Sequence, residues 1–228
     1  LVSVSDKENI LSLLKILKKY KIKILSSGGT YTAIKKLGYS CTELSKYTGF
    51  KEMLDGRVKT LHPKIHAGIL HDRQNRGHKN EMSSRKFPSI DLIVVNFYPF
   101  QKVVRSSKNS KDIIENIDIG GPTLVRSAAK NFKNVTILTN KKDYPNLIKE
   151  LEKNKGKTSL KFRELMSSKA FGLTAYYDAM IANWFNQKLN IRFPERKTIF
   201  GRKLKKLRYG ENPHQDSSIY VSDYNDTE

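Results

Sequence analysis

The sequence predicts an α/β protein in which a parallel sheet is flanked by helices on both faces. Short apolar, β-branched runs alternate with amphipathic stretches through the first 150 residues, an order typical of parallel strands joined by crossover helices. The nearly continuous apolar run at 90–95 is typical of a strand buried on both faces. Ligands of such sheets bind beyond the carboxyl ends of the strands. The loops that follow the strands are therefore the expected place for a site.

The strands are expected at short apolar runs that turn residues bound. They cover 1–4, 21–25, 40–44, 90–95 and 135–138. Helices are expected where apolar residues recur every three or four positions. They cover the stretch that follows Ser5 and ends at about residue 20, and then 31–37, 111–116, 122–131, 144–153 and 159–190. Ser5 and Glu8 fit a capping box at the start of the first helix. Gly38 fits a left-handed cap at the end of the second helix, and Gly172 is a position where the last helix could break.

The remaining stretches lack a clear helical or strand pattern. Residues 56–68 form a strongly basic run, and Pro63 biases His62 away from helical geometry, so an extended loop is expected there. Residues 69–86 are polar and remain unassigned. Residues 191–208 are rich in Pro, Gly and basic residues and read as a linker, and 209–228 are too short to fold alone. The expected division is a domain over 1–190 followed by a linker and domain start over 191–228.

Composition narrows the classes of protein. The formal net charge of the 228 residues is +21, from 43 Lys and Arg against 22 Asp and Glu, which suits phosphorylated ligands or nucleic acid. Lysines are spread along the whole chain, so a lysine-rich proteome would give the same excess. Cys41 is the only cysteine, which excludes an intrachain disulfide. No apolar run is long enough to cross a bilayer and no signal peptide is visible, so a cytoplasmic protein without a membrane partner is expected.

The sequence at 27–30, Ser-Gly-Gly-Thr, joins a predicted strand to a predicted helix. Glycines let backbone amides approach an anion closely, and the start of a helix adds a favourable dipole. Lys7 follows the first strand and would bring a positive charge to the same edge. The run lacks the patterns of nucleoside triphosphate and dinucleotide loops. It therefore predicts a cradle for a monophosphate, although a plain turn into a helix would look the same.

Other polar residues at strand ends are ambiguous one at a time. His62 and His66 are four positions apart, but Pro63 interrupts them and no glutamate follows the first histidine, so no metal site is expected. Asp118 either caps a helix or serves as a base. Tyr98 is most simply explained as an aromatic residue that packs against its neighbours, and Lys130 as a lysine at the end of a helix.

Taken together, the motifs resemble a known family, AICAR transformylase/IMP cyclohydrolase, in its N-terminal domain. The resemblance rests on Ser-Val-Ser-Asp-Lys at 3–7, Ser-Gly-Gly-Thr at 27–30, Thr-Gly-Phe at 48–50, Glu-Met-Leu at 52–54, Gly-Arg-Val-Lys-Thr-Leu-His-Pro at 56–63, His-Ala-Gly-Ile-Leu at 66–70, Asn-Phe-Tyr-Pro-Phe at 96–100, Ile-Asp-Ile-Gly-Gly at 117–121 and Ala-Ala-Lys-Asn at 128–131. It extends to about residue 190. The run 207–215 resembles the opening of the family's transformylase domain, and the Lys-His pair that serves formyl transfer is absent.

The resemblance implies a methylglyoxal-synthase-like fold and ring closure of formyl-AICAR (FAICAR) to IMP, the last step of de novo purine biosynthesis. It implies no cofactor for this reaction and no metal. Formylation of AICAR by 10-formyltetrahydrofolate would need the domain that is missing here, so it is not expected. The partner is a small nucleotide rather than nucleic acid, and the full-length protein is expected to be a homodimer.

The resemblance also assigns residues. The substrate-binding set comprises Ser5, Lys7, Ser27, Gly28, Gly29, Thr30, Arg57, Thr60, Asn96, Ile119 and Gly120, and the catalytic group comprises Lys59, Tyr98, Asp118 and Lys130. Remnants of a transformylase-domain AICAR site would be Arg208, Tyr209 and His214. Asp118 would accept a proton from the carboxamide nitrogen, Lys59 would stabilise the oxyanion, and Tyr98 would protonate it. Lys130 would lie about 12 Å along a straight helix from Pro122, which places it far from Asp118.

Two alternatives remain from the sequence. A binding module of the same fold would sense a phosphorylated metabolite without turnover, and would have no need for the tyrosine, the aspartate and the two lysines. A nucleic-acid binder would explain the charge, and its affinity would fall steeply with salt. No helix-turn-helix, zinc motif or array of stacking aromatics supports that second alternative.

Overall fold

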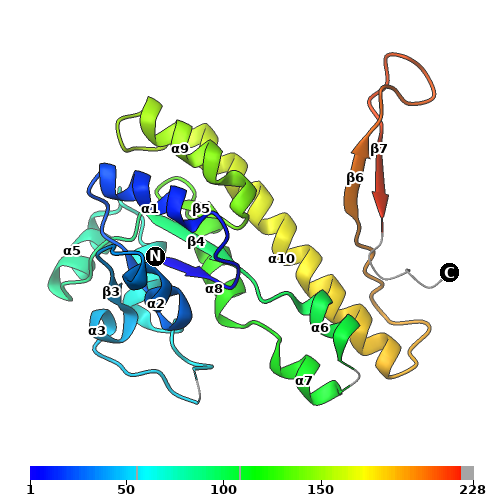
Figure 1. The fold of residues 1–228 in the computed structure, drawn as a ribbon, viewed down its shortest axis with the longest axis horizontal. Coiled ribbons are helices and arrows are strands. Elements are labelled where there is room, and N and C mark those ends of the chain that lie inside the picture. Colours follow the sequence, from blue (N-terminus) through cyan, green and yellow to red (C-terminus); the bar gives the residue numbers. More distant parts are fainter. Residues whose placement is uncertain (55, 108, 222–228) are drawn as a thin grey trace. The chain divides into compact units, whose positions relative to one another are not determined.

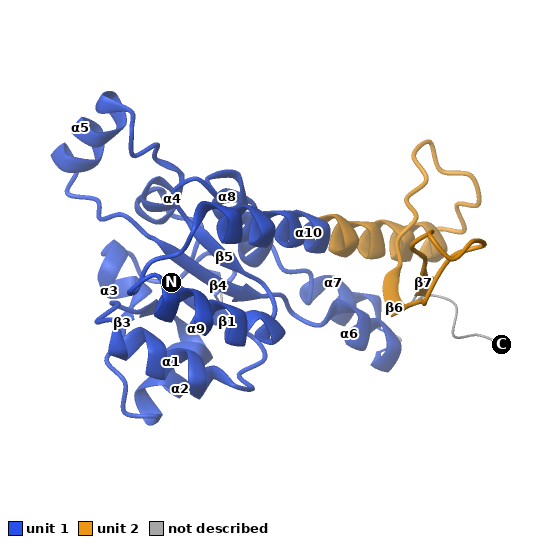
Figure 2. Cartoon of the chain, turned by 90° about the horizontal axis from the view of Figure 1, so that it is seen from above, with its two compact units in different colours: residues 1–174 blue, residues 175–228 orange. Residues whose placement is uncertain are grey.

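The computed structural model describes residues 1–54, 56–107 and 109–221. The chain divides into two compact units, which comprise residues 1–174 and 175–228 (Figure 2). The first unit contains the predicted sheet and every strand-end motif singled out in the sequence. The second is described separately below.

The first unit is built on parallel strands. Strands β1 (Val2–Val4), β4 (Leu92–Asn96) and β5 (Thr136–Leu138) pair in parallel in the order β1-β4-β5 (Figure 1). Strands β2 (Leu25–Ser26) and β3 (Thr42–Glu43) form a second parallel pair. The Ser26 hydroxyl donates to the Val2 carbonyl oxygen over 2.7 Å, which ties β2 to β1. The predicted parallel α/β architecture is confirmed.

Helices cover both faces of the β1-β4-β5 sheet. The helices are α1 (Ile10–Lys19), α2 (Gly28–Lys36), α3 (Leu44–Thr48), α4 (Pro63–Leu70), α5 (Arg76–Ser84), α6 (Phe100–Ser106), α7 (Ser110–Glu115), α8 (Gly120–Lys130), the 3-10 turn η1 (Lys141–Asp143), α9 (Tyr144–Lys153) and α10 (Leu160–Lys188). Helices α1 and α9 pack together on one face, and α4 and α8 on the other (Figure 2).

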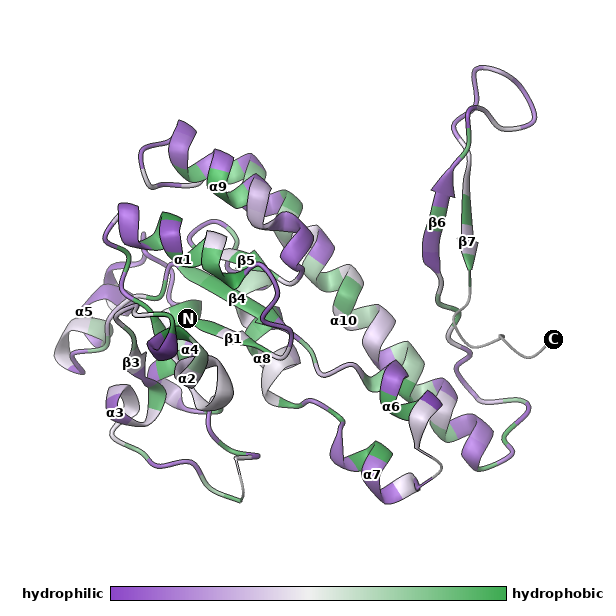
Figure 3. Cartoon of the chain, viewed as in Figure 1, coloured by the Kyte–Doolittle hydropathy of each residue, from purple (hydrophilic) through white to green (hydrophobic). Residues whose placement is uncertain are grey.

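The core lies between these layers. On β4, Ile93, Val94 and Val95 are buried, as the nearly continuous apolar run predicts for a central parallel strand. The two layers contribute their apolar faces, which include Leu13 from α1 and Val125 from α8. Figure 3 shows apolar residues on β1, β4 and β5 and polar residues on the outer helix faces. Each fully buried side chain of this size contributes about 1.5–3 kcal/mol of transfer free energy.

The predicted capping box is wrong. Helix α1 begins at Ile10, after Asn9 in the left-handed conformation, and no side chain caps it. The Ser5 hydroxyl instead donates toward the Asn96 amide oxygen and the Phe97 carbonyl oxygen. Glu8 pairs with Lys141. Tertiary partners from β4 and η1 therefore displace the local hydrogen bonds that the sequence pattern predicts.

The predicted loop at 56–68 is helical from Pro63 onward. His62 has extended backbone geometry, as expected before a proline, but Pro63 is the first residue of α4. The His62 Nδ1 accepts a hydrogen bond from the Lys64 backbone N–H over 3.1 Å. Ile65 and Ile69 are fully buried on the inner face of α4. Proline suits the first helical position because its missing N–H has no partner there in any case, so the same residue that indicates a loop starts a helix.

Other boundaries also differ from the sequence expectations. Helix α2 begins at Gly28 rather than at 31, and α8 begins at Gly120 rather than at 122. Helices α3 and α6 were not expected, and α5 occupies part of the unassigned stretch. Gly172 does not break α10. Gly38 has a φ of 76°, as predicted for the residue after α2. No helix within the described ranges is long and apolar enough to cross a membrane.

The second unit contains the last turns of α10 and a hairpin. Strands β6 (Arg202–Lys206) and β7 (Ser218–Val221) pair antiparallel, with an irregular register between Lys203 and Lys205. Residues 202–206, expected as part of a linker, therefore form a strand with a partner from the region expected to be too short to fold alone. Residues 222–228 of that region lie outside the described part of the chain.

Two glycines inside helices offer a matched test of the packing. A methyl group on Gly68 would lie 2.9 Å from the Pro88 carbonyl oxygen and 3.1 Å from Ile90 Cγ1, whereas one on Gly172 would meet nothing within 4 Å. Gly68→Ala is expected to lower the free energy of unfolding by about 1–3 kcal/mol through overpacking. Gly172→Ala is expected to raise it by about 0.5–1 kcal/mol through helix propensity. Urea denaturation checks both, and equal effects would contradict the packing of α4.

Candidate active site

The carboxyl ends of β1 and β4 are joined by the side chain of Asn96. Its amide oxygen accepts hydrogen bonds from the Ser5 backbone N–H over 2.6 Å and from the Asp6 backbone N–H over 3.2 Å. Its amide nitrogen donates to the Asp6 carbonyl oxygen over 3.1 Å. Asn96, expected to contact a ligand, therefore holds the turn that carries Ser5 and Lys7. This turn lies at the edge of the sheet where parallel α/β folds bind ligands.

Two lysine ammonium groups lie at the start of α2. Gly28 has a φ of 51°, and a methyl group on it would be 3.8 Å from Lys59 Nζ. A methyl group on Gly29 would be 3.9 Å from Lys7 Nζ. The cap residue Ser27 makes no capping hydrogen bond with its side chain. Exposed amides, the positive end of the helix dipole and two cations together favour an anion at this place.

Thr30 has a structural role in addition to its place in the cradle. Its hydroxyl is buried, donates to the Val4 carbonyl oxygen over 3.0 Å and accepts from the Val4 backbone N–H over 3.1 Å. These two bonds fix the first turn of α2 against β1. The backbone N–H of Thr30 belongs to the first turn of the helix, where amides lack intrahelical partners. Thr30 can therefore offer its backbone amide to an anion while its hydroxyl stays bound to β1.

Thr60, in the basic run, packs against Gly120 at the start of α8. The side chain of Thr60 is buried, and a methyl group on Gly120 would lie 2.5 Å from its Oγ1. Only glycine allows this approach, because any Cβ would overlap the hydroxyl. The neighbouring residue Lys59 extends toward the start of α2. Residues 59–60 therefore connect the anion cradle with the first turn of α8.

Asp118 is held at that first turn. Its Oδ1 accepts a hydrogen bond from the Gly121 backbone N–H over 2.8 Å, and the Tyr98 backbone N–H also donates to the carboxylate. Burial raises the pKa of the Asp118 carboxyl above its ordinary value, although both N–H groups and the charge of Lys59 act in the opposite direction. The capping and functional roles considered for Asp118 are thus compatible. A partly buried carboxylate beside a lysine can serve as a general base.

Two further predicted residues flank Asp118 with exposed side chains. The Tyr98 side chain is 49% exposed, while its backbone faces the carboxylate. Ile119 is 60% exposed and precedes α8. The structure therefore brings Lys59, Tyr98, Asp118 and Ile119 to one side of the first unit. An exposed phenol and an apolar side chain there are available to a planar ligand.

Arg57 forms an ion pair with a residue that the sequence did not single out. Its Nε donates to Glu115 Oε1 over 3.0 Å, and its Nη2 contacts Glu115 Oε2. Both side chains are exposed. Glu115 ends α7, which precedes Asp118 in the chain. The one sign of Glu115 in the sequence is that it is an acidic residue just before the Ile-Asp-Ile-Gly-Gly run. Its pairing with Arg57, 58 positions away, cannot be predicted from the sequence.

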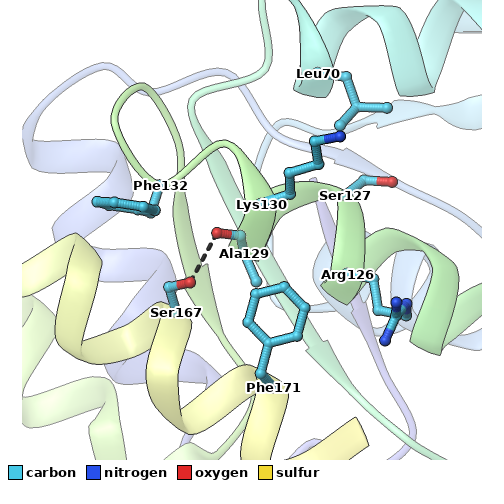
Figure 4. Close-up of a pocket in the computed structure, with 8 residues that line it drawn as sticks. All are labelled: Leu70, Arg126, Ser127, Ala129, Lys130, Phe132, Ser167 and Phe171. Atoms are coloured by element: carbon cyan, nitrogen blue, oxygen red, sulfur yellow. Dashed lines mark hydrogen bonds between the residues drawn. The ribbon is translucent and has the colours of Figure 1, made fainter.

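Lys130 is not brought together with Asp118. It is the last residue of the unbroken helix α8, which begins at Gly120. A rise of 1.5 Å per residue places it about 15 Å along the axis from the start of that helix. Lys130 instead lines a pocket with Leu70 and Phe171 (Figure 4).

The two histidines of the basic run do not face a shared ligand position. His62 caps α4, and His66 Nδ1 lies 3.1 Å from the Ser127 hydroxyl. Burial lowers the pKa of the His66 imidazole. Within the described ranges, no group of three His, Cys, Asp or Glu residues could hold a metal ion.

The predicted transformylase remnants belong to the second unit. Arg208, Tyr209 and His214 lie in the connection between β6 and β7. Tyr209 is 54% exposed, and a hydrogen bond from Gly210 N–H to the Gln215 carbonyl oxygen closes a turn beside it.

The start of α2, residues 59–60 and Asp118 together form what we call the strand-end site. The fold and this site define a class of protein. It is a parallel α/β domain that brings two lysine ammonium groups to the start of α2 and a lysine charge near a partly buried aspartate. The match to known families agrees with this class: residues 9–123 match the MGS-like domain, and residues 128–228 match the AICARFT/IMPCHase bienzyme. The chain belongs to the AICARFT/IMPCHase family and carries its MGS-like domain.

Curated relatives and a solved structure support this assignment. The chain is 46% identical over 222 residues to the bifunctional purine biosynthesis protein PurH of Bradyrhizobium diazoefficiens, with 97% of the chain and 42% of the relative covered. It is 48% identical over 221 residues to PurH of Leptospira biflexa, with 96% of the chain and 43% of the relative covered. The chain therefore spans less than half the length of these relatives. The crystal structure of ForH matches with a TM-score of 0.72 and 31% identity, over 81% of this chain and 95% of that one.

The raised pKa of Asp118 predicts a pH dependence of stability. The folded state holds this proton more tightly than the unfolded chain, so the carboxyl stabilises the fold most at low pH. Its contribution declines as pH rises through the ordinary value of 3.8 and the raised folded value. Asp118→Asn should therefore raise the melting temperature, relative to wild type, more at about pH 7 than at about pH 3.

Asp6 provides the control with the opposite sign. A hydrogen bond from Lys141 lowers the pKa of Asp6, so its contribution is present above the ordinary value of 3.8 and is lost as pH falls through the folded value. Asp6→Asn should therefore lower the melting temperature more at about pH 7 than at about pH 3. Thermal unfolding by circular dichroism measures both variants. A shift of the same sign in both would contradict the burial of Asp118.

Proposed function

We propose that the first unit is an IMP cyclohydrolase, which closes the ring of FAICAR to form IMP in purine biosynthesis. The observation that carries the proposal is the position of Lys59 between two groups. It lies next to Gly28 in the anion cradle, and its charge acts on the Asp118 carboxyl. A phosphate held by the cradle would thus place the remainder of a nucleotide at a general base and a cation. The names of the relatives and the bienzyme family support the same pathway.

The proposed binding mode follows the geometry. The 5′-phosphate is held by Lys7, by the Ser27 hydroxyl and by the backbone amides of residues 28–30. The Ser5 hydroxyl supports the turn before Lys7, because it already donates to Asn96 and Phe97. The base lies against Thr60, Gly120 and the exposed Ile119 side chain. Asn96 acts mainly by holding the turn of Ser5, because its amide is occupied by that turn.

The proposed reaction needs a base, an acid and a cation at the reacting atoms. The carboxamide nitrogen attacks the formyl carbon, and Asp118 accepts the proton that this nitrogen loses. Lys59 stabilises the negative charge that develops on the formyl oxygen, and the Tyr98 phenol protonates it. Asp118 then returns its proton to this hydroxyl, the carbon–oxygen bond breaks, and the oxygen leaves as water. The nitrogen that carried the formyl group loses its own N–H proton, which restores the Tyr98 phenol and leaves a carbon–nitrogen double bond in the closed ring. No redox step or transferred group is involved, so no cofactor is required.

Lys130 has no part in this proposed sequence, because α8 separates it from Asp118. Formylation of AICAR with 10-formyltetrahydrofolate, and assembly into a homodimer, are proposed only for a full-length protein. Arg208, Tyr209 and His214 would belong to that second activity, which we do not expect from this chain.

The direct test is conversion of FAICAR by the purified chain, without folate or added metal. IMP formation above the rate in buffer is expected. A well-folded chain that binds IMP but does not convert FAICAR to IMP would contradict the enzymatic proposal and favour a binding module.

Lys59→Ala should reduce turnover about 10²–10³-fold, the usual cost of losing a group that stabilises an oxyanion. The matched control is Lys46→Ala, which removes the same charge from the exposed face of α3. Steady-state kinetics with FAICAR would compare the two variants, and urea denaturation would confirm that both are folded. Near wild-type turnover in Lys59→Ala would remove Lys59 from the mechanism.

Glu115→Gln should strengthen binding of IMP by up to about fivefold, because it removes one carboxylate that competes with the ligand for Arg57. An exposed ion pair is worth about 0–1 kcal/mol, so little stability should be lost. Titration calorimetry with IMP measures the change, and Glu81→Gln serves as control because it breaks the exposed Arg85 pair on α5. Weaker binding in Glu115→Gln would show that the ion pair holds Arg57 in its binding position.

A further inference from the structure

A pocket lies at the opposite end of α8 from Asp118. Its volume is about 460 Å³, which is within the range of small-molecule sites, roughly 300–1,000 Å³. Three helices of the first unit and the residues after α8 form its walls (Figure 4). They contribute Leu70, Arg126, Ser127, Ala129, Lys130, Phe132, Ser167 and Phe171.

The pocket carries positive charge that is not neutralised. Arg126 and Lys130 are four positions apart on α8, so they lie on one face of the helix, where like charges repel. The lining residues include no carboxylate, and none within the described ranges pairs with either cation. The carbonyl end of α8 brings only about half a negative charge. Both residues are exposed, so water screens their mutual repulsion, and an anion placed between them would be attracted by both positive charges.

An aromatic surface lies beside these charges. The guanidinium of Arg126 lies 5.8 Å from the centroid of the Phe171 ring, a distance at which cation and ring attract. Phe171 and Leu70 are each 40% exposed. Figure 4 shows the Phe171 ring between Arg126 and Ala129. The pocket thus offers an exposed aromatic ring and an apolar side chain together with two cations.

The hydroxyl groups of the pocket hold its walls in place. The buried Ser167 hydroxyl donates to the Ala129 carbonyl oxygen over 2.7 Å and ties α10 to α8. The Ser127 hydroxyl donates to the Thr123 carbonyl oxygen over 2.9 Å and lies 3.1 Å from His66 Nδ1, which ties α4 to α8. Because these groups already have partners, recognition of a ligand is left to Arg126, Lys130 and the apolar side chains.

We propose that this pocket binds a nucleoside monophosphate, at a site separate from the strand-end site. The base packs against Phe171 and Leu70, and the phosphate binds between Arg126 and Lys130. A small phosphate alone would leave the aromatic surface unused, and an uncharged nucleoside would leave the two cations unused. The proposal goes beyond the ring-closure function and does not require it.

The experiment uses IMP as the probe and titration calorimetry as the readout. The variant Lys7→Ala/Lys59→Ala removes both ammonium groups from the strand-end cradle, and it should still bind IMP at one site. Adding Arg126→Ala should weaken this binding about tenfold or more. Arg126→Lys should give an intermediate loss, because it keeps the charge but loses the planar group over Phe171. Ribose 5-phosphate and inosine should each bind more weakly than IMP.

Lys133→Ala is the matched control, since it removes a nearby exposed charge that does not line the pocket. It should leave IMP binding unchanged. In the otherwise wild-type chain, Arg126→Ala should keep the rate of ring closure, which separates this test from that of the proposed function. The proposal is overturned if the double variant does not bind IMP, if Arg126→Ala leaves its affinity unchanged, or if Lys133→Ala lowers the affinity equally.

Discussion

The hydrogen bonds between the Asn96 side chain and the turn after β1 hold together the part of the molecule on which the site depends. Residues 91 positions apart meet there, since the amide of Asn96 both accepts from and donates to the backbone of residues 5–6. The turn then carries Lys7 to the start of α2, while Thr30 fixes that helix to β1. The anion cradle is thus a product of strand pairing rather than of one motif.

The chemistry of the site arises from the packing of Thr60 on Gly120. This contact sets residues 59–60 against the first turn of α8, where Asp118 is held by backbone amides and partly buried. Burial keeps its pKa above the ordinary value, and the neighbouring lysine acts in the opposite direction. Helix α8 then runs away from the site and ends at Lys130, so one end borders the strand-end site and the other lines the pocket of Arg126 and Phe171.

The basic run shows where sequence reasoning succeeds and where it stops. Its charge and its proline were correctly read as signs of a loop near His62, but the proline also begins α4 because Ile65 and Ile69 find a buried surface. The capping box at Ser5 failed for a related reason, since a partner from β4 was available to its hydroxyl. Local patterns describe which hydrogen bonds are possible, and distant residues decide which of them form.

The sequence by itself determined the parallel α/β class, the strand at 90–95, the existence of a helix after the glycine-rich run at 27–30, and the set of polar residues at the strand ends. These follow from short-range periodicity and from residue types that act within a few positions. Only the tertiary structure decided that Lys59 lies beside Gly28, that Arg57 pairs with Glu115, and that Lys130 is distant from Asp118. Those facts depend on where helices begin and on which faces they bury, and both are set by contacts between residues far apart in the chain.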